Sequence, residues 1–271
     1  MSVNGAIAVV TGGGHGIGRA LCRALHRQGA SIAVVDIDAE AARTVAAEID
    51  GKAYDVDVGD EEQIATLIDR IEREVGPIDL FISNAGVGFG DEGTAASAQG
   101  GIRPIDDRWT ASWQINVMAH VYAARVLLPR MIGRGGGHLV NIASAAGLLS
   151  QIGDAAYTAT KHAAVAFAES LAISHGDDNI DVSVVCPQAV ATRMFGIEDD
   201  SDSVDGGFGG NDVDGIIRPD VAADMIVDGI REKRFLILTH PEVAEYVRRK
   251  ADDRDRWIGG MRRFRRSLLE S

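Results

Sequence analysis

Short apolar runs alternate with longer amphipathic stretches along most of this chain. The runs are too continuous for half-exposed strands and are typical of parallel strands that helices cover on both faces. About seven strands are predicted, at 6–10, 31–35, 52–56, 78–82, 138–142, 181–185 and 235–238. Helical spacing predicts helices between them, at 16–29, 38–49, 60–75, 109–132, 156–175 and 218–231. This alternation predicts an α/β fold, a doubly wound parallel sheet that binds its ligands beyond the carboxyl ends of the strands.

The length of 271 residues suits one α/β sheet with a single core, so we expect one domain over 1–271. Two stretches interrupt the alternation, because 88–101 is rich in small residues and 197–215 combines acidic residues with glycines. Neither can bury a core. The acidic stretch is predicted to be a flexible loop, either a mobile lid or a tolerated insertion. Residues 240–271 form a charged, partly helical C-terminal extension that either covers a substrate site or joins subunits.

Charge and composition limit the partners of the protein. The formal net charge of −13 repels a nucleic-acid backbone, and the basic run 262–266 is interpreted as a solvated helix face or a subunit contact. No apolar run approaches the roughly 18 residues of a membrane span. The two cysteines lack metal or redox spacing and the histidines do not cluster, so no metal is expected. We therefore expect a cytoplasmic protein without nucleic-acid or membrane partners.

A glycine-rich segment, TGGGHGIG at 11–18, follows the first predicted strand and leads into a helix. Glycines allow a tight turn with exposed amide groups, and the unpaired N–H groups and dipole of a helix N-terminus stabilise an anion. The strand before the loop and the helix after it make a phosphate site much more probable than the loop alone would. We expect Gly12, His15, Gly16 and Ile17 to bind the phosphates of a cofactor.

The second predicted strand is followed by Asp36, close to the distance from the glycine loop at which an acid accepts hydrogen bonds from the adenosine ribose. A 2′-phosphate there would meet a like charge. Cationic help is missing from the neighbouring positions, since Ile37 follows the acid and His15 stands in the loop. The sequence therefore favours NAD over NADP. Asp36 can at the same time help to cap the next helix.

Tyr157 and Lys161 are four residues apart in a predicted helix, hence one turn apart on the same face. A free phenol has a pKa of about 10, and a nearby ammonium stabilises the phenolate and lowers that pKa toward neutrality. Lys161 would thus tune Tyr157 for proton transfer. Alone, this spacing is common on solvated helix surfaces, and the surrounding motifs decide between the two interpretations.

Two more polar motifs lie just past predicted strands, Asn84-Ala85-Gly86 and Ser144. With the glycine loop and the Tyr-x-x-x-Lys pair, they resemble in order and spacing the short-chain dehydrogenase/reductase family, in its single-domain branch with a Thr-Gly-x-x-x-Gly-x-Gly loop. The resemblance covers about residues 5–192. It implies a Rossmann fold and an NAD(P)-dependent alcohol dehydrogenase or ketone reductase, with NAD preferred.

The resemblance also implies a role for individual residues. Tyr157 matches the acid/base, Ser144 the hydroxyl that holds the substrate oxygen, and Asn116 the residue that orders a water relay. Lys161 would hydrogen-bond the nicotinamide ribose besides tuning Tyr157. Further cofactor contacts are implied for Asp57, Val58, Asn84, Ala85, Gly86, Val190 and Thr192. Core packing or turn capping is the alternative for Asn84, Asn116 and Asp57.

One match is imperfect, because Gln188 replaces a glycine in the stretch 186–192 that resembles the carboxamide-binding loop. If that glycine has a positive φ in relatives, Gln188 costs about 1 kcal/mol or more, or the loop moves. The contacts expected of Val190 and Thr192 depend on this point.

The implied reaction moves a hydride between the nicotinamide and a secondary alcohol or ketone, and the residues after the motifs predict a largely apolar substrate pocket. A homodimer or homotetramer is implied, packed through the helices at 109–132 and 156–175. The alternatives are a non-catalytic dinucleotide-binding sensor or scaffold of the same fold, and an enzyme that uses the cofactor for epimerisation or dehydration. The presence of Ser144, Tyr157 and Lys161 argues against a non-catalytic sensor or scaffold.

Overall fold

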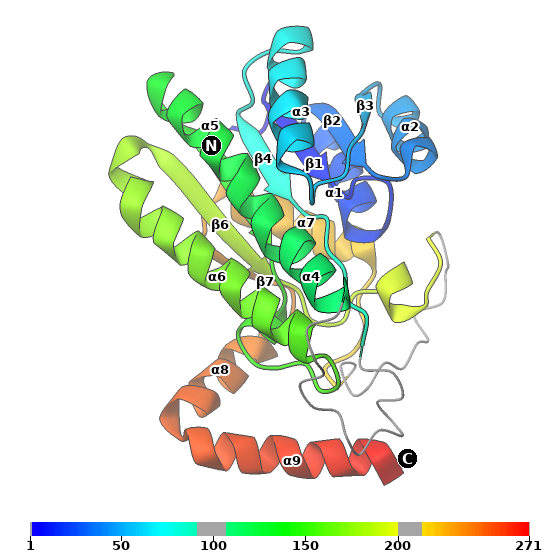
Figure 1. Ribbon diagram of the computed structural model, residues 1–271, viewed down its shortest axis with the longest axis vertical. Helices are drawn as coiled ribbons and strands as arrows, with labels where there is room; N and C mark the ends of the chain where they lie inside the picture. The colour runs from blue at the N-terminus through cyan, green and yellow to red at the C-terminus, as the bar shows by residue number, and fades with distance from the viewer. Residues whose placement is uncertain (1, 91–106, 200–212, 271) are drawn as a thin grey trace.

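The computed structural model describes residues 2–90, 107–199 and 213–270, so the predicted small-residue stretch 88–101 and the acidic stretch 197–215 lie mostly outside the described residues. Its centre is a sheet of seven parallel strands in the order β3-β2-β1-β4-β5-β6-β7 (Figure 1). The strands are β1 (Ile7–Thr11), β2 (Ser31–Asp36), β3 (Lys52–Asp55), β4 (Leu80–Ser83), β5 (Gly137–Ile142), β6 (Ile180–Cys186) and β7 (Leu236–Leu238). The strand order reverses between β1 and β4, which pair directly from Ala8 with Leu80 to Val10 with Ile82. The predicted doubly wound sheet is confirmed, with each strand within about two residues of its predicted bounds.

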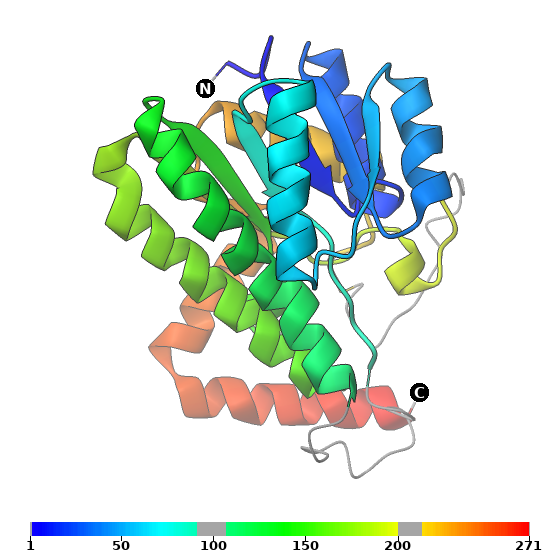
Figure 2. The same cartoon turned by 45° about the horizontal axis from the view of Figure 1, so that its top comes forward.

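Helices cover both faces of the sheet (Figures 1 and 2). On one face lie α3 (Glu61–Glu74), α5 (Ala119–Gly133) and α6 (Ala155–His175), and on the other α1 (Gly16–Arg27), α2 (Ala39–Glu48) and α7 (Pro219–Arg231). Consecutive strand residues face opposite sides, so Val9 packs in the first cluster while Ala8 and Val10 pack in the second. Both clusters are apolar, which explains why the strand segments are apolar at every position.

The predicted helix at 109–132 is divided into three parts. An α-helical start, α4 (Asp107–Trp113), is followed by a π-helical turn, η1 (Gln114–Met118), and then by α5. A π-turn adds a residue to the helical repeat and shifts the faces of the two flanking segments relative to each other. Asn116 lies at its centre and is fully buried.

The C-terminal extension forms two helices, α8 (Glu242–Asp252) and α9 (Arg254–Glu270), which meet at Asp253 (Figure 2). Lys250 of α8 fastens the extension to the body, since its Nζ donates to the main-chain oxygens of Leu148 (2.7 Å) and Leu149 (2.7 Å). A third contact runs from Lys250 Nζ to His162 Nε2 of α6 (3.3 Å). Within the described residues, no helix is both long and apolar enough to span a bilayer.

Candidate active site

A cleft of about 330 Å³ lies at the carboxyl ends of the strands, where the strand order reverses. This edge is where doubly wound sheets bind their ligands. Every predicted site residue except Asn116 lines the cleft. Asn116 lies behind its wall, because its side chain is fully buried.

The glycine loop forms one end of the cleft between β1 and α1. A Cβ on Gly18 would lie 1.9 Å from the main-chain oxygen of Gly12, so helix α1 can approach the loop this closely only with glycine there. His15 is the N-cap of α1 in an extended conformation, and its side chain makes no capping hydrogen bond. His15 therefore leaves the first amide groups of α1 uncapped, which suits an anion, and the first of them, the Gly16 N–H, donates to Asp199 Oδ1 (2.9 Å).

Asp36 ends β2 beside the same loop and is 8% exposed. Its Oδ2 accepts a hydrogen bond from the Gly14 N–H (2.8 Å), and its Oδ1 accepts from the Asp38 N–H (3.0 Å). Asp38, not Asp36, caps α2 through the N–H groups of Glu40 and Ala41. Asp36 thus fixes the glycine loop and keeps a carboxylate at the cleft edge.

Asn84 and Thr11 join the ends of β4 and β1. Asn84 Nδ2 donates to the main-chain oxygens of Thr11 (2.8 Å) and Gly12 (3.1 Å), and Thr11 Oγ1 accepts from the N–H groups of Asn84 (2.9 Å) and Ala85 (3.1 Å). The side chain of Asn84 is therefore used to hold the loop, as the turn-capping alternative expects. Asn84, Ala85 and Gly86 still present their backbone to the cleft.

Asp57 and Val58 follow β3 and line the cleft. The Asp57 carboxylate accepts from the Gly59 N–H (2.8 Å), so it closes the turn before α3. Asp60 then caps α3 through the N–H groups of Glu62 and Gln63. Asp57 thus caps this turn and also lines the cleft.

Tyr157 is positioned by the N-terminus of α6. Asp154 caps this helix, with its Oδ1 accepting from the Tyr157 N–H (2.8 Å). The other oxygen of Asp154 accepts from the N–H groups of Phe89 (3.1 Å) and Gly90 (2.9 Å), so one buried carboxylate holds both the tyrosine helix and the segment after β4. The sequence analysis did not name Asp154, although an Asp at the start of a predicted helix is the usual signal of a cap.

Ser144, Tyr157 and Lys161 converge in the cleft. Ser144 and Tyr157 both line the cleft, where the Ser144 hydroxyl favours the ionised phenol of Tyr157, and Lys161 Nζ lies 5.5 Å from the centroid of the Tyr157 ring. Lys161 is 3% exposed and donates from Nζ to the main-chain oxygen of Ile142 (3.1 Å). One side chain from the N-cap of η2 (Ala145–Gly147) and two from α6 thus line the same part of the cleft.

The expected lowering of the Tyr157 pKa is not what the structure gives. Burial raises the pKa of Tyr157 and outweighs the opposing hydrogen bond from Ser144. Burial also lowers the pKa of Lys161 to about 8. Desolvation disfavours the charged form of each group, so near neutrality Lys161 keeps a positive charge in a place where the Tyr157 proton is held firmly.

Asn116 acts behind the cleft. Its side chain exchanges two hydrogen bonds with the backbone of Val87 (2.9 Å each) and donates to Thr160 Oγ1 (3.1 Å). A Cβ on Gly86 would lie 3.2 Å from both Asn116 Oδ1 and Lys161 Nζ, so these two side chains approach the same point of the backbone. The π-turn is the device that brings Asn116 to this position beside α6.

The backbone of Gln188 is not strained, although this residue stands where the resembling loop has a glycine. The described non-glycine residues with positive φ are Asp50, Asn179 and Lys233, so Gln188 has an ordinary backbone conformation. Its Nε2 donates to Asp214 Oδ2 (2.9 Å), and Asp214 Oδ1 accepts from the hydroxyl of Tyr246 in α8 (2.8 Å). The carboxamide loop is thus linked to the C-terminal extension.

Val190 and Thr192 follow Gln188 along the cleft wall. Val190 forms an isolated parallel bridge with Ile217, and a Cβ on Gly16 would lie 3.0 Å from Thr192 Cγ2. The loop after β6 therefore faces the glycine loop across the cleft. Arg193 and Met194, which the sequence analysis did not single out, complete this wall.

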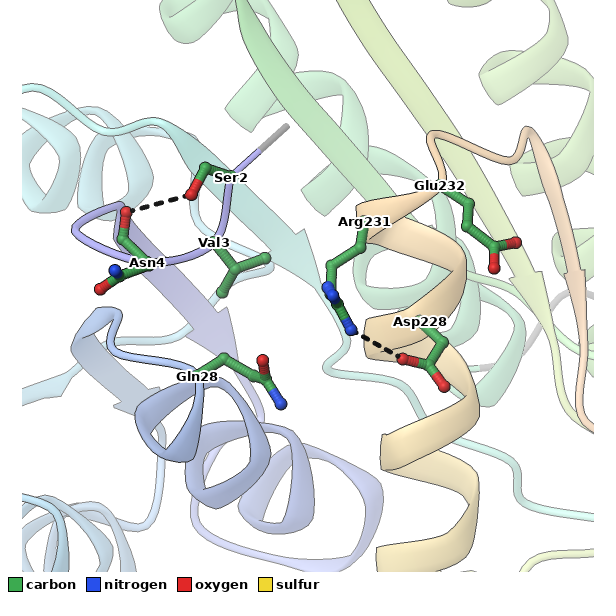
Figure 3. Close-up of a pocket in the computed structure, with 7 residues that line it drawn as sticks. All are labelled: Ser2, Val3, Asn4, Gln28, Asp228, Arg231 and Glu232. Carbon is green, nitrogen blue, oxygen red and sulfur yellow. Dashed lines mark hydrogen bonds and ion pairs between the residues drawn. The ribbon is translucent and has the colours of Figure 1, made fainter.

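A second hollow, of about 450 Å³, lies near the N-terminus between the C-terminal ends of α1 and α7 (Figure 3). Its lining is polar and, apart from Val3, exposed, and Arg231 in it is paired with Asp228 (3.3 Å). It holds none of the predicted site residues. We therefore assign the chemistry to the cleft at the carboxyl ends of the strands.

Known proteins resemble this chain over the same region. The family model of the short chain dehydrogenases matches residues 6–202. The 1-deoxy-11-beta-hydroxypentalenate dehydrogenase of Streptomyces exfoliatus is 32% identical over 253 residues, 91% of this chain and 87% of the relative. Epidermal retinol dehydrogenase 2 of Mus musculus is 34% identical over 203 residues, 72% of this chain, and the match spans 63% of that relative's length.

A solved structure agrees with the fold. A short chain dehydrogenase/reductase from Burkholderia phymatum in complex with NAD superimposes with a TM-score of 0.79 at 27% identity, over 94% of this chain and 96% of that one. The residues matched by the family model include the glycine loop, the Ser144 turn and helix α6. This chain belongs to the short-chain dehydrogenase/reductase family.

Proposed function

We propose that the protein is an NAD-dependent oxidoreductase that interconverts a secondary alcohol and a ketone on a largely apolar small molecule. The observation that carries the proposal is the convergence of Ser144, Tyr157 and Lys161 in the cleft that the glycine loop closes. When bound, the cofactor would supply the hydride acceptor or donor. The protein then needs only to orient the substrate, move one proton and exclude water.

Each side chain of the group has a distinct task in the proposal. The Ser144 hydroxyl holds the substrate oxygen next to the Tyr157 hydroxyl, which donates the proton in reduction and accepts it in oxidation. Lys161 hydrogen-bonds the cofactor ribose and stabilises the phenolate electrostatically. Asn116 holds the backbone after β4 beside Lys161 and would order a water there.

The cleft fits a dinucleotide on two grounds besides its location. The amide end of α1 and the close approach that Gly12 and Gly18 permit suit a diphosphate. Asp36 offers carboxylate oxygens to the adenosine ribose, and the neighbouring Ile37 side chain is 69% exposed and uncharged. This arrangement supports the preference for NAD over NADP.

Apolar side chains in the cleft support an apolar substrate. Val87, Ile142, Pro187 and Met194 line the cleft, together with polar residues such as Gln188. Two similar proteins are named for the dehydrogenation of a retinol and of a hydroxypentalenate. A carbocyclic or isoprenoid alcohol is the substrate class we propose.

The proposal is tested with a panel of secondary alcohols and ketones, followed by nicotinamide absorbance, on the parent protein and a Tyr157→Phe variant. Tyr157→Phe keeps the ring in its packing and removes the proton. We expect turnover to fall at least about 100-fold while NAD affinity stays within a few-fold. Turnover within about threefold of the parent would remove Tyr157 from its proposed role.

Three related statements remain proposals. We propose that the whole chain works as one domain and that its location is cytoplasmic. A homodimer or homotetramer packed through α5 and α6 is supported by the exposed Ile132 and Ile173 on these helices. Light scattering of an Ile173→Asp variant, compared with the parent, tests that contact surface.

A further inference from the structure

The Asp199 side chain lies on the amino end of helix α1. Its Oδ1 accepts a hydrogen bond from the Gly16 N–H (2.9 Å), and its Oδ2 accepts from His15 Nδ1 (2.7 Å). A carboxylate in this position is stabilised by the unpaired amide groups and the dipole of the helix. The contact joins the segment after β6 to the glycine loop across the cleft.

Arg193 completes the surroundings of this carboxylate. Its Nε lies 3.2 Å from Asp199 Oδ2, and its Nη1 lies 3.1 Å from His15 Nε2. Burial pushes the pKa of Asp199 up, but the Gly16 amide, His15 and Arg193 outweigh it and hold that pKa below its ordinary value. Asp199 is thus a firmly held anion whose side chain is 12% exposed.

The three groups that hold Asp199 also line the nucleotide cleft. Carboxylate and phosphate oxygens are both anionic acceptors of N–H groups, and a planar guanidinium pairs with either. One backbone N–H cannot serve a protein carboxylate and a ligand phosphate fully at the same time. Asp199 and a diphosphate therefore compete for this end of the cleft.

We propose that Asp199 is an internal competitor for the diphosphate of the cofactor and that Arg193 and His15 bind the diphosphate once Asp199 is displaced. The proposal rests on the proposed NAD function and adds a phosphate-binding residue, Arg193, outside the glycine loop. The apparent affinity for the nucleotide is reduced by the cost of displacing Asp199. Asp199→Asn removes the negative charge and so lowers that cost.

The test is calorimetric titration of the full chain with NAD, ADP-ribose, inorganic pyrophosphate and adenosine at fixed ionic strength. We expect Asp199→Asn to tighten the three diphosphate ligands about tenfold and to leave adenosine unchanged. Arg193→Gln is expected to weaken the same three ligands about tenfold. Thermal melts check that both variants are folded.

The charge-matched control is Glu198→Gln. This neighbouring acid lies 3.3 Å from Arg193 Nε, but its side chain is 81% exposed. We expect Glu198→Gln to bind NAD, ADP-ribose, inorganic pyrophosphate and adenosine with affinities within about threefold of those of the parent. Equal tightening by Glu198→Gln and Asp199→Asn would show a general charge effect and overturn the proposal.

Two further outcomes separate this proposal from the proposed function. If the parent binds NAD and Asp199→Asn binds it no tighter, the competition is refuted while the NAD function stands. If the parent binds neither NAD nor ADP-ribose, but Asp199→Asn gains pyrophosphate affinity that Glu198→Gln does not, the competition for a diphosphate anion stands and the NAD function fails.

Discussion

Asp36 gives a sharp test of the cofactor preference. Its carboxylate is 8% exposed at the end of β2 and is already oriented by two backbone N–H groups. In an Asp36→Asn variant the side chain keeps its shape and one carbonyl oxygen for the Gly14 N–H, but it loses the charge. The substitution therefore changes the charge that a bound ribose or 2′-phosphate would meet, and it leaves the glycine loop largely in place.

The magnitude follows from the hydrogen bonds involved. A hydrogen bond to a charged acceptor contributes about 1.5–3 kcal/mol and a neutral one about 0.5–1.5 kcal/mol, so each ribose hydrogen bond loses roughly 1–1.5 kcal/mol, and NAD binding loses roughly 1–3 kcal/mol if one or two ribose hydroxyls are involved. That cost corresponds to a Kd about 5–150-fold weaker. A 2′-phosphate is repelled by the carboxylate and not by the amide, so NADP is expected to bind several-fold tighter. The preference ratio should shift by about two orders of magnitude.

Calorimetric titration with NAD and NADP measures both constants. Asp36→Ala should shift the ratio in the same direction, and it should lose more stability because the Gly14 and Asp38 N–H groups both lose their acceptor. Asp55→Asn is the matched control, because Asp55 is the exposed β3 partner of Asp36 in the sheet register. An unchanged NAD to NADP ratio in Asp36→Asn would refute the assignment of the ribose site.

Two further predictions concern stability. In Lys250→Met the main-chain oxygens of Leu148 and Leu149 lose their donor, so we expect the free energy of unfolding in urea to fall by about 1–3 kcal/mol. Lys250→Arg should lose less stability. An unchanged free energy of unfolding in Lys250→Met would contradict the role of Lys250 in holding the extension to the body. Burial lowers the pKa of His138 to about 4, so between about pH 6.5 and 4 the unfolded chain binds a proton that the folded one does not. The free energy of unfolding should then fall by up to roughly 1.4 kcal/mol for each unit by which the pH is lowered. In His138→Gln, compared with the parent by urea titrations at pH 7, 6 and 5, the free energy of unfolding should depend less steeply on pH. The same pH dependence in both proteins would exclude His138 as its cause.

The sheet was predictable because both faces of it are covered. Strands such as β1, with apolar residues facing each cluster, differ from the amphipathic helices in pattern as well as in length. The predicted bounds are correct to within about two residues for the same reason. The π-turn around Asn116 could not be predicted, because an apolar pattern fixes the face of a helix but not a local change in its hydrogen-bond repeat.

The cleft was predictable where residue type and chemistry coincide, as in the glycine loop, Asp36, Ser144, Tyr157 and Lys161. Contacts between distant segments gave no local signal. Asp199 is one of several acids in a segment without periodicity, and nothing near it in the chain indicates a contact with Gly16. The pKa of Tyr157 also depends on burial, which the spacing of Tyr157 and Lys161 does not describe.

Asp214 links the amide of Gln188 and the phenol of Tyr246 through one carboxylate. The terminal helices are therefore connected to the wall of the cleft through a single side chain. A chain that keeps Ser144, Tyr157 and Lys161 but differs after β7 is therefore expected to present a different wall at Gln188. Exchange of the terminal segment between family members is accordingly a direct route to altered substrate scope.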